Sequence, residues 1–174
     1  MDGQLAALFF MISLSDMTRN HCETGCLARS TAQEAISFSY GDVIFQENTI
    51  GREAYLRYDL GSVLGPFQPA IGLSATDSDD VWVGIGATHT TRLWNNQSGA
   101  GGYAQLHFMP GLHVQGDGPD LGTAIEFRSG VEVGWQSNKG LRFGVSYDHR
   151  SNGDLSSVNP GLETLQLRVS IPFR

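Results

Sequence analysis

Apolar and polar residues alternate along most of the chain after residue 35, which is the pattern of half-buried β-strands. No segment in this part of the chain shows the helical period of apolar positions. Clusters of Gly, Asn, Asp, Ser and Pro separate the alternating runs. The eight expected strands cover residues 35–45, 50–60, 66–76, 80–93, 102–113, 122–136, 140–151 and 161–173. An even number of short alternating segments is typical of small barrels, so the pattern predicts an all-β, eight-stranded antiparallel barrel.

The two faces of the expected strands differ in polarity. On the strand at 161–173, one face is wholly apolar and carries Leu165, Leu167, Val169, Ile171 and Phe173. A soluble barrel turns such a face inward, whereas an outer-membrane barrel turns it outward to lipid. Opposite charges nearly balance on the polar faces, and glycines lie between them, as a narrow buried lumen requires. These features favour the outer-membrane barrel over the soluble one. The charged positions in question are Arg57, Arg128, Arg142, Arg150 and Arg168 against Asp59, Glu126, Glu132 and Asp148.

Aromatic residues near the strand ends are consistent with a membrane setting. Outer-membrane barrels carry rings of aromatic side chains at the two membrane interfaces. The residues predicted to form such rings are Trp82, Trp94, Trp135, Tyr147 and Phe173.

Composition narrows the class further. The chain has 174 residues, which is the size of one domain, and only 17 % of them are charged. Soluble domains carry about 25 % charged residues, so part of this surface is predicted not to face water. The net charge is −7 and no Lys/Arg cluster is present, which argues against nucleic-acid binding. No apolar run is long enough for a membrane-spanning helix.

Residues 1–32 differ from the rest of the chain. The apolar run from Leu5 to Leu14 has the length of a signal-peptide core, although Asp2 precedes it and no Lys or Arg does. Ser30-Thr31-Ala32 would supply a small-residue cleavage site before Gln33. We expect residues 1–32 to be either an export segment or an ordinary N-terminal tail, and residues 33–174 to form the single barrel domain.

Both cysteines, Cys22 and Cys26, lie in this N-terminal segment. Their spacing is not accompanied by a second pair of ligands, so a zinc site is not expected.

Three polar side chains interrupt the predicted lipid face. Because side chains alternate along a strand, His149 and Ser151 share the apolar face of Tyr147, and Glu163 begins the apolar row of the last strand. Ionisable groups on a lipid-facing surface are costly and usually functional. The last two strands form a hairpin, which would bring Glu163 within about 5 Å of His149. This is the order of nucleophile, base and orienting carboxylate that a serine esterase needs, although a chance His-x-Ser pair at a strand end gives the same spacing.

The same residues carry a family resemblance. His149-Arg150-Ser151-Asn152-Gly153, followed by Asn159-Pro160-Gly161-Leu162-Glu163, resembles the C-terminal motif of the lipid A 3-O-deacylase (PagL-type) family. The resemblance is close from about residue 140 onward and weaker over the remaining strands. Gly153 stands where the family more usually has Ala.

The resemblance implies a fold, a location and a reaction. It implies an eight-stranded barrel in the Gram-negative outer membrane that hydrolyses the ester-linked acyl chain at the 3-position of lipid A, without a cofactor or a metal. Ser151 would be the nucleophile, His149 the general base, and Glu163 the residue that orients His149. Asn152 and the main-chain N–H of Gly153 would stabilise the oxyanion.

Three neighbouring apolar residues, Val145, Tyr147 and Leu165, are expected to form a shallow acyl-chain groove. With both termini in the periplasm, the last hairpin faces the cell exterior, where lipopolysaccharide lies. The partners are thus lipid A and the outer membrane, and a homodimer is left open.

Two other groups of residues have simpler explanations. The acidic turn Asp77–Asp80 resembles a cation site only superficially and is expected to be solvated. Of His89, His107 and His113, two share a strand face with Tyr103 and Gln105, so hydrogen bonding in the lumen is the expected role.

Two rival functions remain open. A non-catalytic surface barrel explains the alternation but not the polar residues on the lipid face, and its outward loops would be unusually short for an adhesin. A soluble ligand-carrying barrel would turn the Leu165–Phe173 row inward.

Overall fold

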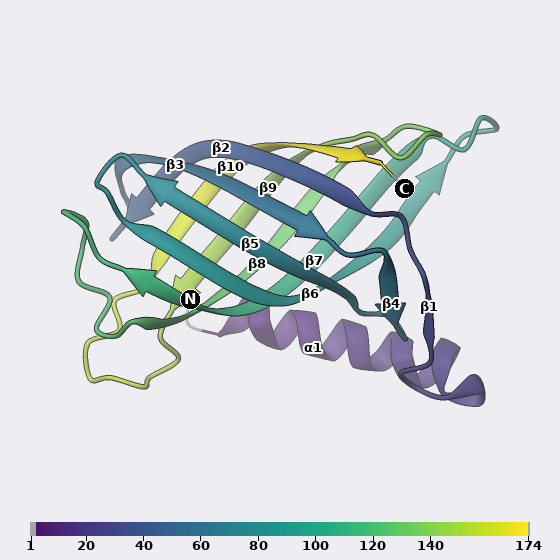
Figure 1. Ribbon diagram of the computed structural model, residues 1–174, viewed down its shortest axis with the longest axis horizontal. Coiled ribbons are helices and arrows are strands. Elements are labelled where there is room, and N and C mark those ends of the chain that lie inside the picture. The colour runs from purple at the N-terminus through teal and green to yellow at the C-terminus, as the bar shows by residue number, and fades with distance from the viewer. Residues whose placement is uncertain (1–2, 174) are drawn as a thin grey trace.

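The computed structural model describes residues 3–173. Residues 1, 2 and 174, which belong to the predicted ranges 1–32 and 33–174, lie outside the described residues. Eight antiparallel strands close into a barrel in the order β10-β2-β3-β5-β6-β7-β8-β9 (Figure 1). They are β2 (Ala35–Phe45), β3 (Asn48–Asp59), β5 (Gln68–Thr76), β6 (Val81–Asn95), β7 (Gly101–Val114), β8 (Ile125–Gln136), β9 (Arg142–Ser151) and β10 (Leu162–Pro172). The prediction of eight strands and of their places is confirmed.

The apolar faces point outward from the barrel. Leu165 and Leu167 are 45 % and 71 % exposed on the outer wall, whereas Arg168, one position along the strand, is 2 % exposed. This is the inverted arrangement of a membrane barrel, since a soluble barrel would expose the arginine and bury the leucines. The direction of the faces, which alternation alone leaves open, is therefore settled in favour of the outer-membrane form.

Paired charges fill the lumen. Arg128 donates to Asp148 at 2.7 Å and to Glu53 at 3.0 Å, and its guanidinium lies 3.9 Å from the centre of the Tyr55 ring. On the same inner surface Arg168 donates to Glu132 at 2.6 Å. Buried charges of this kind are tolerated because each has an opposite partner and additional hydrogen bonds.

The lumen histidines also have acidic neighbours that the sequence spacing did not reveal. His107 Nε2 lies 3.6 Å from Asp148, and His113 Nε2 lies 3.7 Å from Asp80. His107 and His113 lie in the lumen as expected, but neither ring nitrogen of His107 forms a hydrogen bond within residues 3–173. His89, by contrast, lies on the outer wall beside α1, where it pairs with the hydroxyl of Thr91 at 3.2 Å.

One of the predicted interfacial aromatics is placed wrongly. Trp82 is fully buried in the lumen, where it packs with Tyr55 and Met109. It follows Val81, which points outward, so the period of two turns Trp82 inward. The other aromatic residues near the ends of β6 and β8, Trp94 and Trp135, are exposed on the outer wall as predicted.

The N-terminal segment lies against the outside of the barrel. Helix α1 (Gln4–Asp16) packs on β7 and β8 and is followed by two short helical turns, η1 (Met17–His21) and η2 (Cys22–Thr24) (Figure 1). None of the helices within residues 3–173 is long and apolar enough to cross a membrane.

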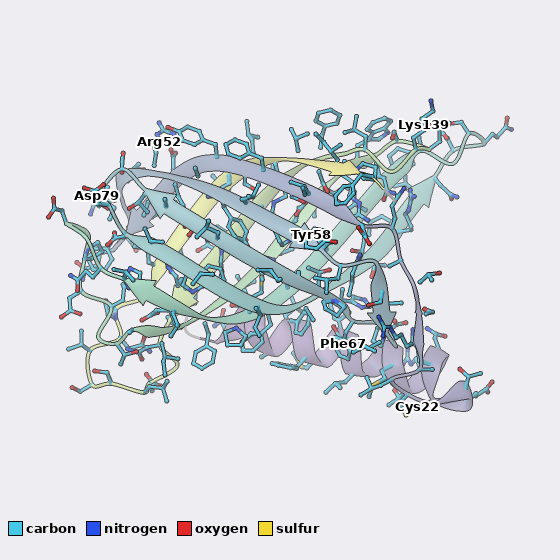
Figure 2. All side chains as sticks on the ribbon, viewed as in Figure 1. Cys22, Arg52, Tyr58, Phe67, Asp79 and Lys139 are labelled. Carbon is cyan, nitrogen blue, oxygen red and sulfur yellow. A yellow bond between two sulfur atoms is a disulfide. The ribbon has the colours of Figure 1, made fainter. Side chains whose placement is uncertain are left out.

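The end of this segment lies beside the β3–β5 connection. The short strands β1 (Arg29–Thr31) and β4 (Ser62–Leu64) pair with each other, and a disulfide joins Cys22 to Cys26. Figure 2 shows Cys22 at the far end of α1, at the same end of the molecule as Phe67. Neither the disulfide nor the β1–β4 pair was expected from the sequence.

Candidate active site

The register of three neighbouring strands places the candidate residues in one row on the outer wall. Ser129 of β8 pairs with His149 of β9, which in turn pairs with Glu163 of β10. Ser151 lies two residues beyond His149 on the same face and pairs with Phe127 of β8. Directly paired side chains on one face of a sheet lie about 4.5–5.5 Å apart at Cβ. The sequence-predicted His149, Ser151 and Glu163 are therefore brought together.

His149 and Glu163 form a hydrogen bond. His149 Nδ1 lies 3.0 Å from Glu163 Oε1, and the two side chains are 3 % and 19 % exposed. A carboxylate at Nδ1 fixes the orientation of the ring and leaves Nε2 at its opposite edge, which is the arrangement of a catalytic base with its orienting acid.

Ser151 ends β9 and is almost completely buried, with 6 % of its surface exposed. Its hydroxyl forms no hydrogen bond with any of residues 3–173, so Ser151 and His149 are not hydrogen-bonded to each other in this structure. Contacts between nucleophile and base are often long without substrate and shorten when it binds. Both residues line one groove, which is the feature that catalysis requires.

The groove has a volume of about 390 Å³ and opens on the outer wall, at the end of the barrel where the loop between β9 and β10 lies. Phe108 and Phe127 stack beside it, with ring centroids 5.9 Å apart, and provide an apolar surface next to Ser151. Gly3, Ala6 and Phe10 of the N-terminal segment also line the groove. An apolar groove that contains a nucleophile is suited to an acyl chain.

The residues predicted to hold the acyl chain lie elsewhere on the same wall. Tyr147 borders a hollow beside Glu163 and Pro160, and Val145 and Leu165 border another beside Tyr40. None of the three lines the groove that contains Ser151. Ser151 lies beyond the start of β10, so its neighbour is β8 and not the strand that carries Leu165.

Asn152 does not point its side-chain amide into the groove. It is fully buried, and its Nδ2 donates to Leu121 O at 2.8 Å and to Val158 O at 2.7 Å. Both side-chain donors are therefore engaged in joining two outer loops. The predicted role of this amide as an oxyanion donor does not fit this geometry, because Asn152 instead joins the two loops beside Ser151.

Gly153 remains well placed for the oxyanion. It lines the groove, has a φ of +62°, and its backbone N–H has no acceptor among residues 3–173. A Cβ at this position would approach the Phe127 ring to 3.2 Å, so glycine keeps the groove open here. Asn159 also lines the groove, and its Oδ1 accepts the backbone N–H of Asn152 at 3.0 Å.

Three groove residues on the barrel strands were not predicted as site residues: Ser129, Phe108 and Phe127. Ser129 carries a signal in the sequence, because it is a polar position in the apolar row that runs from Ile125 to Val133. No such signal marks the two phenylalanines, which resemble the other lipid-facing residues.

No group of three or more His, Cys, Asp or Glu residues within residues 3–173 is placed to hold a metal ion. In the acidic turn, Asp80 accepts hydrogen bonds from the Ser78 hydroxyl and from the backbone of Gly116.

Comparisons with known proteins match the chain to one family and to small outer-membrane barrels. The family model "Lipid A 3-O-deacylase (PagL)" matches residues 44–172. The crystal structure of the outer-membrane enzyme PagL superposes with a TM-score of 0.67 at 16 % identity, over 80 % of this chain and 99 % of that one. Neisserial surface protein A superposes with a TM-score of 0.53 at 14 % identity, over 84 % and 99 % of the two chains. No curated protein matches the sequence.

Proposed function

The chain belongs to the lipid A 3-O-deacylase (PagL) family, and we propose that it performs this reaction as a serine esterase in which Ser151, His149 and Glu163 form the triad. As a member of this family with a closed eight-stranded barrel, it is an outer-membrane enzyme that removes the ester-linked acyl chain at the 3-position of lipid A. The observation that carries the assignment of residues is the His149–Glu163 hydrogen bond beside the groove that contains Ser151.

The first half of the reaction forms an acyl-enzyme. His149 accepts the proton of Ser151 as the Ser151 oxygen attacks the ester carbonyl carbon, and Glu163 supports the imidazolium that results. His149 then gives this proton to the departing 3-hydroxyl oxygen of lipid A as the ester bond breaks. The acyl chain remains attached to Ser151 and lies against Phe108 and Phe127.

The oxyanion of the tetrahedral intermediate needs donors beside Ser151. The backbone N–H of Gly153 is available there, because it has no acceptor among the described residues and lies in the wall of the groove. Loss of one oxyanion donor typically lowers kcat by about 10²–10³-fold. Asn152 contributes indirectly, since its bonds to Leu121 and Val158 hold the backbone of the next residue in place.

The location of the groove fits the substrate. It lies at the end of the barrel where the loop between β9 and β10 is, opposite the end at which β2 begins and β10 ends (Figure 1). This is the outer end when β2 begins and β10 ends on the periplasmic side, and the groove opens on the outer wall. Lipopolysaccharide occupies the outer leaflet at this level. Lipid A within the membrane is the partner that this mechanism requires, and it requires neither a second copy of the chain nor a nucleic acid.

Mass spectrometry of lipid A from Gram-negative cells that express the chain tests the proposal. The wild type is expected to remove one hydroxyacyl chain, whereas Ser151→Ala leaves lipid A intact. Ser146→Ala serves as the matched control because Ser146 lies on the same strand but faces the lumen. If the wild type is folded in the outer membrane and lipid A is unchanged, the non-catalytic barrel becomes the better reading. If Ser151→Ala is as active as the wild type, the triad is wrong.

A further inference from the structure

Ser129 is a polar residue that the triad does not use. Its side chain is directed to the outer wall, where it is 3 % exposed and lines the same groove as Ser151 and His149. On one side it pairs with Phe108 and on the other with His149. Ser151 lies diagonally across from it, within the reach of one bridging molecule. The hydroxyl therefore borders both the base and the nucleophile.

The orientation of His149 decides which of its edges Ser129 meets. Glu163, on the β10 side of His149, engages Nδ1. Ser129 lies on the β8 side, toward the opposite edge of the ring, which carries Nε2. Nε2 is the atom that exchanges protons during both halves of the reaction. A group on this side can therefore place a reactant next to the working edge of the base.

The hydroxyl of Ser129 is free for such a role. It forms no hydrogen bond with any of residues 3–173. Apart from His149, its neighbours across the strands and along its own row are Phe108, Phe127 and Val131, whose side chains offer no hydrogen-bonding atom to this face. A serine hydroxyl both donates and accepts, and a water molecule in an apolar groove needs two or more polar partners. Ser129 and Nε2 together supply two.

We propose that Ser129 holds the water molecule that hydrolyses the acyl–Ser151 intermediate, an inference that rests on the serine esterase function proposed above. In this step the water oxygen attacks the acyl carbonyl carbon while His149 takes a proton from the water. The bond between the carbonyl carbon and the Ser151 oxygen then breaks, and His149 returns the proton to Ser151. The fatty acid leaves, and no oxidant, metal or cofactor is consumed.

Ser129 is poorly placed to be the nucleophile itself. It lies in the middle of β8, where the neighbouring backbone N–H groups belong to the sheet, and Gly153 is near Ser151 at the strand end. An attack by Ser129 would leave the oxyanion without a free backbone donor. Its position favours the second half of the reaction over the first.

The test compares the two halves in Ser129→Ala, with purified lipid A in detergent micelles as substrate. The first-turnover burst of released deacylated lipid A is expected to keep its rate and amplitude. The steady-state rate is expected to fall about tenfold, which corresponds to the loss of one hydrogen bond. Intact-protein mass spectrometry should then show the acyl adduct on Ser151 accumulating during turnover.

Two controls separate this role from a structural one. Ser129→Thr keeps the hydroxyl and is expected to restore most of the steady-state rate, whereas Ser146→Ala, a lumen-facing change on β9, is expected to leave both phases unchanged. A Ser129→Ala enzyme with unaltered turnover and no adduct overturns the proposal. So does an equal loss of burst and turnover, because that result assigns Ser129 to acylation or packing. An inactive wild type would instead count against the esterase function.

Discussion

Replacing Glu163 with glutamine tests the orienting role of the carboxylate most directly. The substitution keeps the shape of the side chain and removes its charge. Glu163 Oε1 lies 3.0 Å from His149 Nδ1, and Glu163 is only 19 % exposed. A hydrogen bond to a charged group contributes roughly 1.5–3 kcal/mol, so the loss of the charge alone lowers kcat roughly 10- to 150-fold. Partial exposure of Glu163 favours the lower part of this range, because water screens the charge.

Glutamine adds a second effect that alanine lacks. Its amide N–H can donate a hydrogen bond to Nδ1 of His149, so the imidazole proton stays on Nε2. A protonated Nε2 cannot accept the proton of Ser151. In the well-studied protease triad the corresponding Asp→Asn change lowers kcat about 10⁴-fold for this reason. We therefore expect Glu163→Gln to lower kcat by roughly 10²–10⁴-fold and to be slower than Glu163→Ala. KM should be unchanged, since Glu163 does not line the groove beside Phe127.

Release of fatty acid from lipid A in mixed micelles gives kcat and KM for these variants. The heat-dependent shift of barrel proteins on a denaturing gel gives the folded fraction for each of them. Glu47→Gln is the matched control, because Glu47 borders the same hollow as Glu163 but lies in the turn before β3. A folded Glu163→Gln enzyme that keeps more than half of the wild-type kcat would refute the role of Glu163.

Three other perturbations test the groove, the helix over it and the lumen. Phe127→Ala is expected to raise KM for lipid A several-fold with a smaller change in kcat, because it removes half of the stacked aromatic pair; an unchanged KM would move the acyl chain elsewhere. Replacing both Phe9 and Phe10 with alanine removes their ring contacts with Phe108 and should loosen α1 from the barrel. A cysteine placed at position 127 in the groove should then react with a thiol reagent at least ten times faster, whereas equal labelling rates would mean that α1 does not cover the groove. Arg128→Met should lower the free energy of unfolding by about 3–5 kcal/mol in denaturant titrations, because it leaves the buried carboxylates of Glu53 and Asp148 unpaired. Arg52 is half exposed, so Arg52→Met should lower the free energy of unfolding by less than about 1 kcal/mol.

The sequence predicts the barrel well because a period of two is a strong local signal. Each outward row, such as Leu165 to Phe173, reports the side of the sheet without any knowledge of the neighbouring strands. The same logic finds His149, Ser151 and Glu163, since polar residues are conspicuous in an apolar row. The same period also corrects the predicted position of Trp82. Trp82 follows the outward-facing Val81, so its side chain points into the lumen although it lies near a strand end.

Features that depend on register are not accessible in this way. The side of Ser151 on which the groove lies depends on the residue at which β10 begins. The first residue of β10 pairs with Arg150, so β10 has no residue opposite Ser151. The direction of the Asn152 amide depends on two loops, at Leu121 and Val158, that meet only in the folded chain. The packing of α1 against β7 is equally non-local, since the apolar run in this segment does not indicate which strands it contacts.

The placement of Ser151 on the outer wall changes the meaning of substrate concentration for this enzyme. The groove opens sideways beside the Phe108 and Phe127 rings, and the lumen is filled by paired charges. Under the proposed mechanism, lipid A reaches Ser151 by lateral movement in the plane of the bilayer, and the released fatty acid departs into that same plane. The quantity that sets the rate is the mole fraction of lipid A around the barrel and not its amount per unit volume. Diluting lipid A with inert detergent at constant bulk concentration should slow the reaction, as expected for catalysis confined to two dimensions.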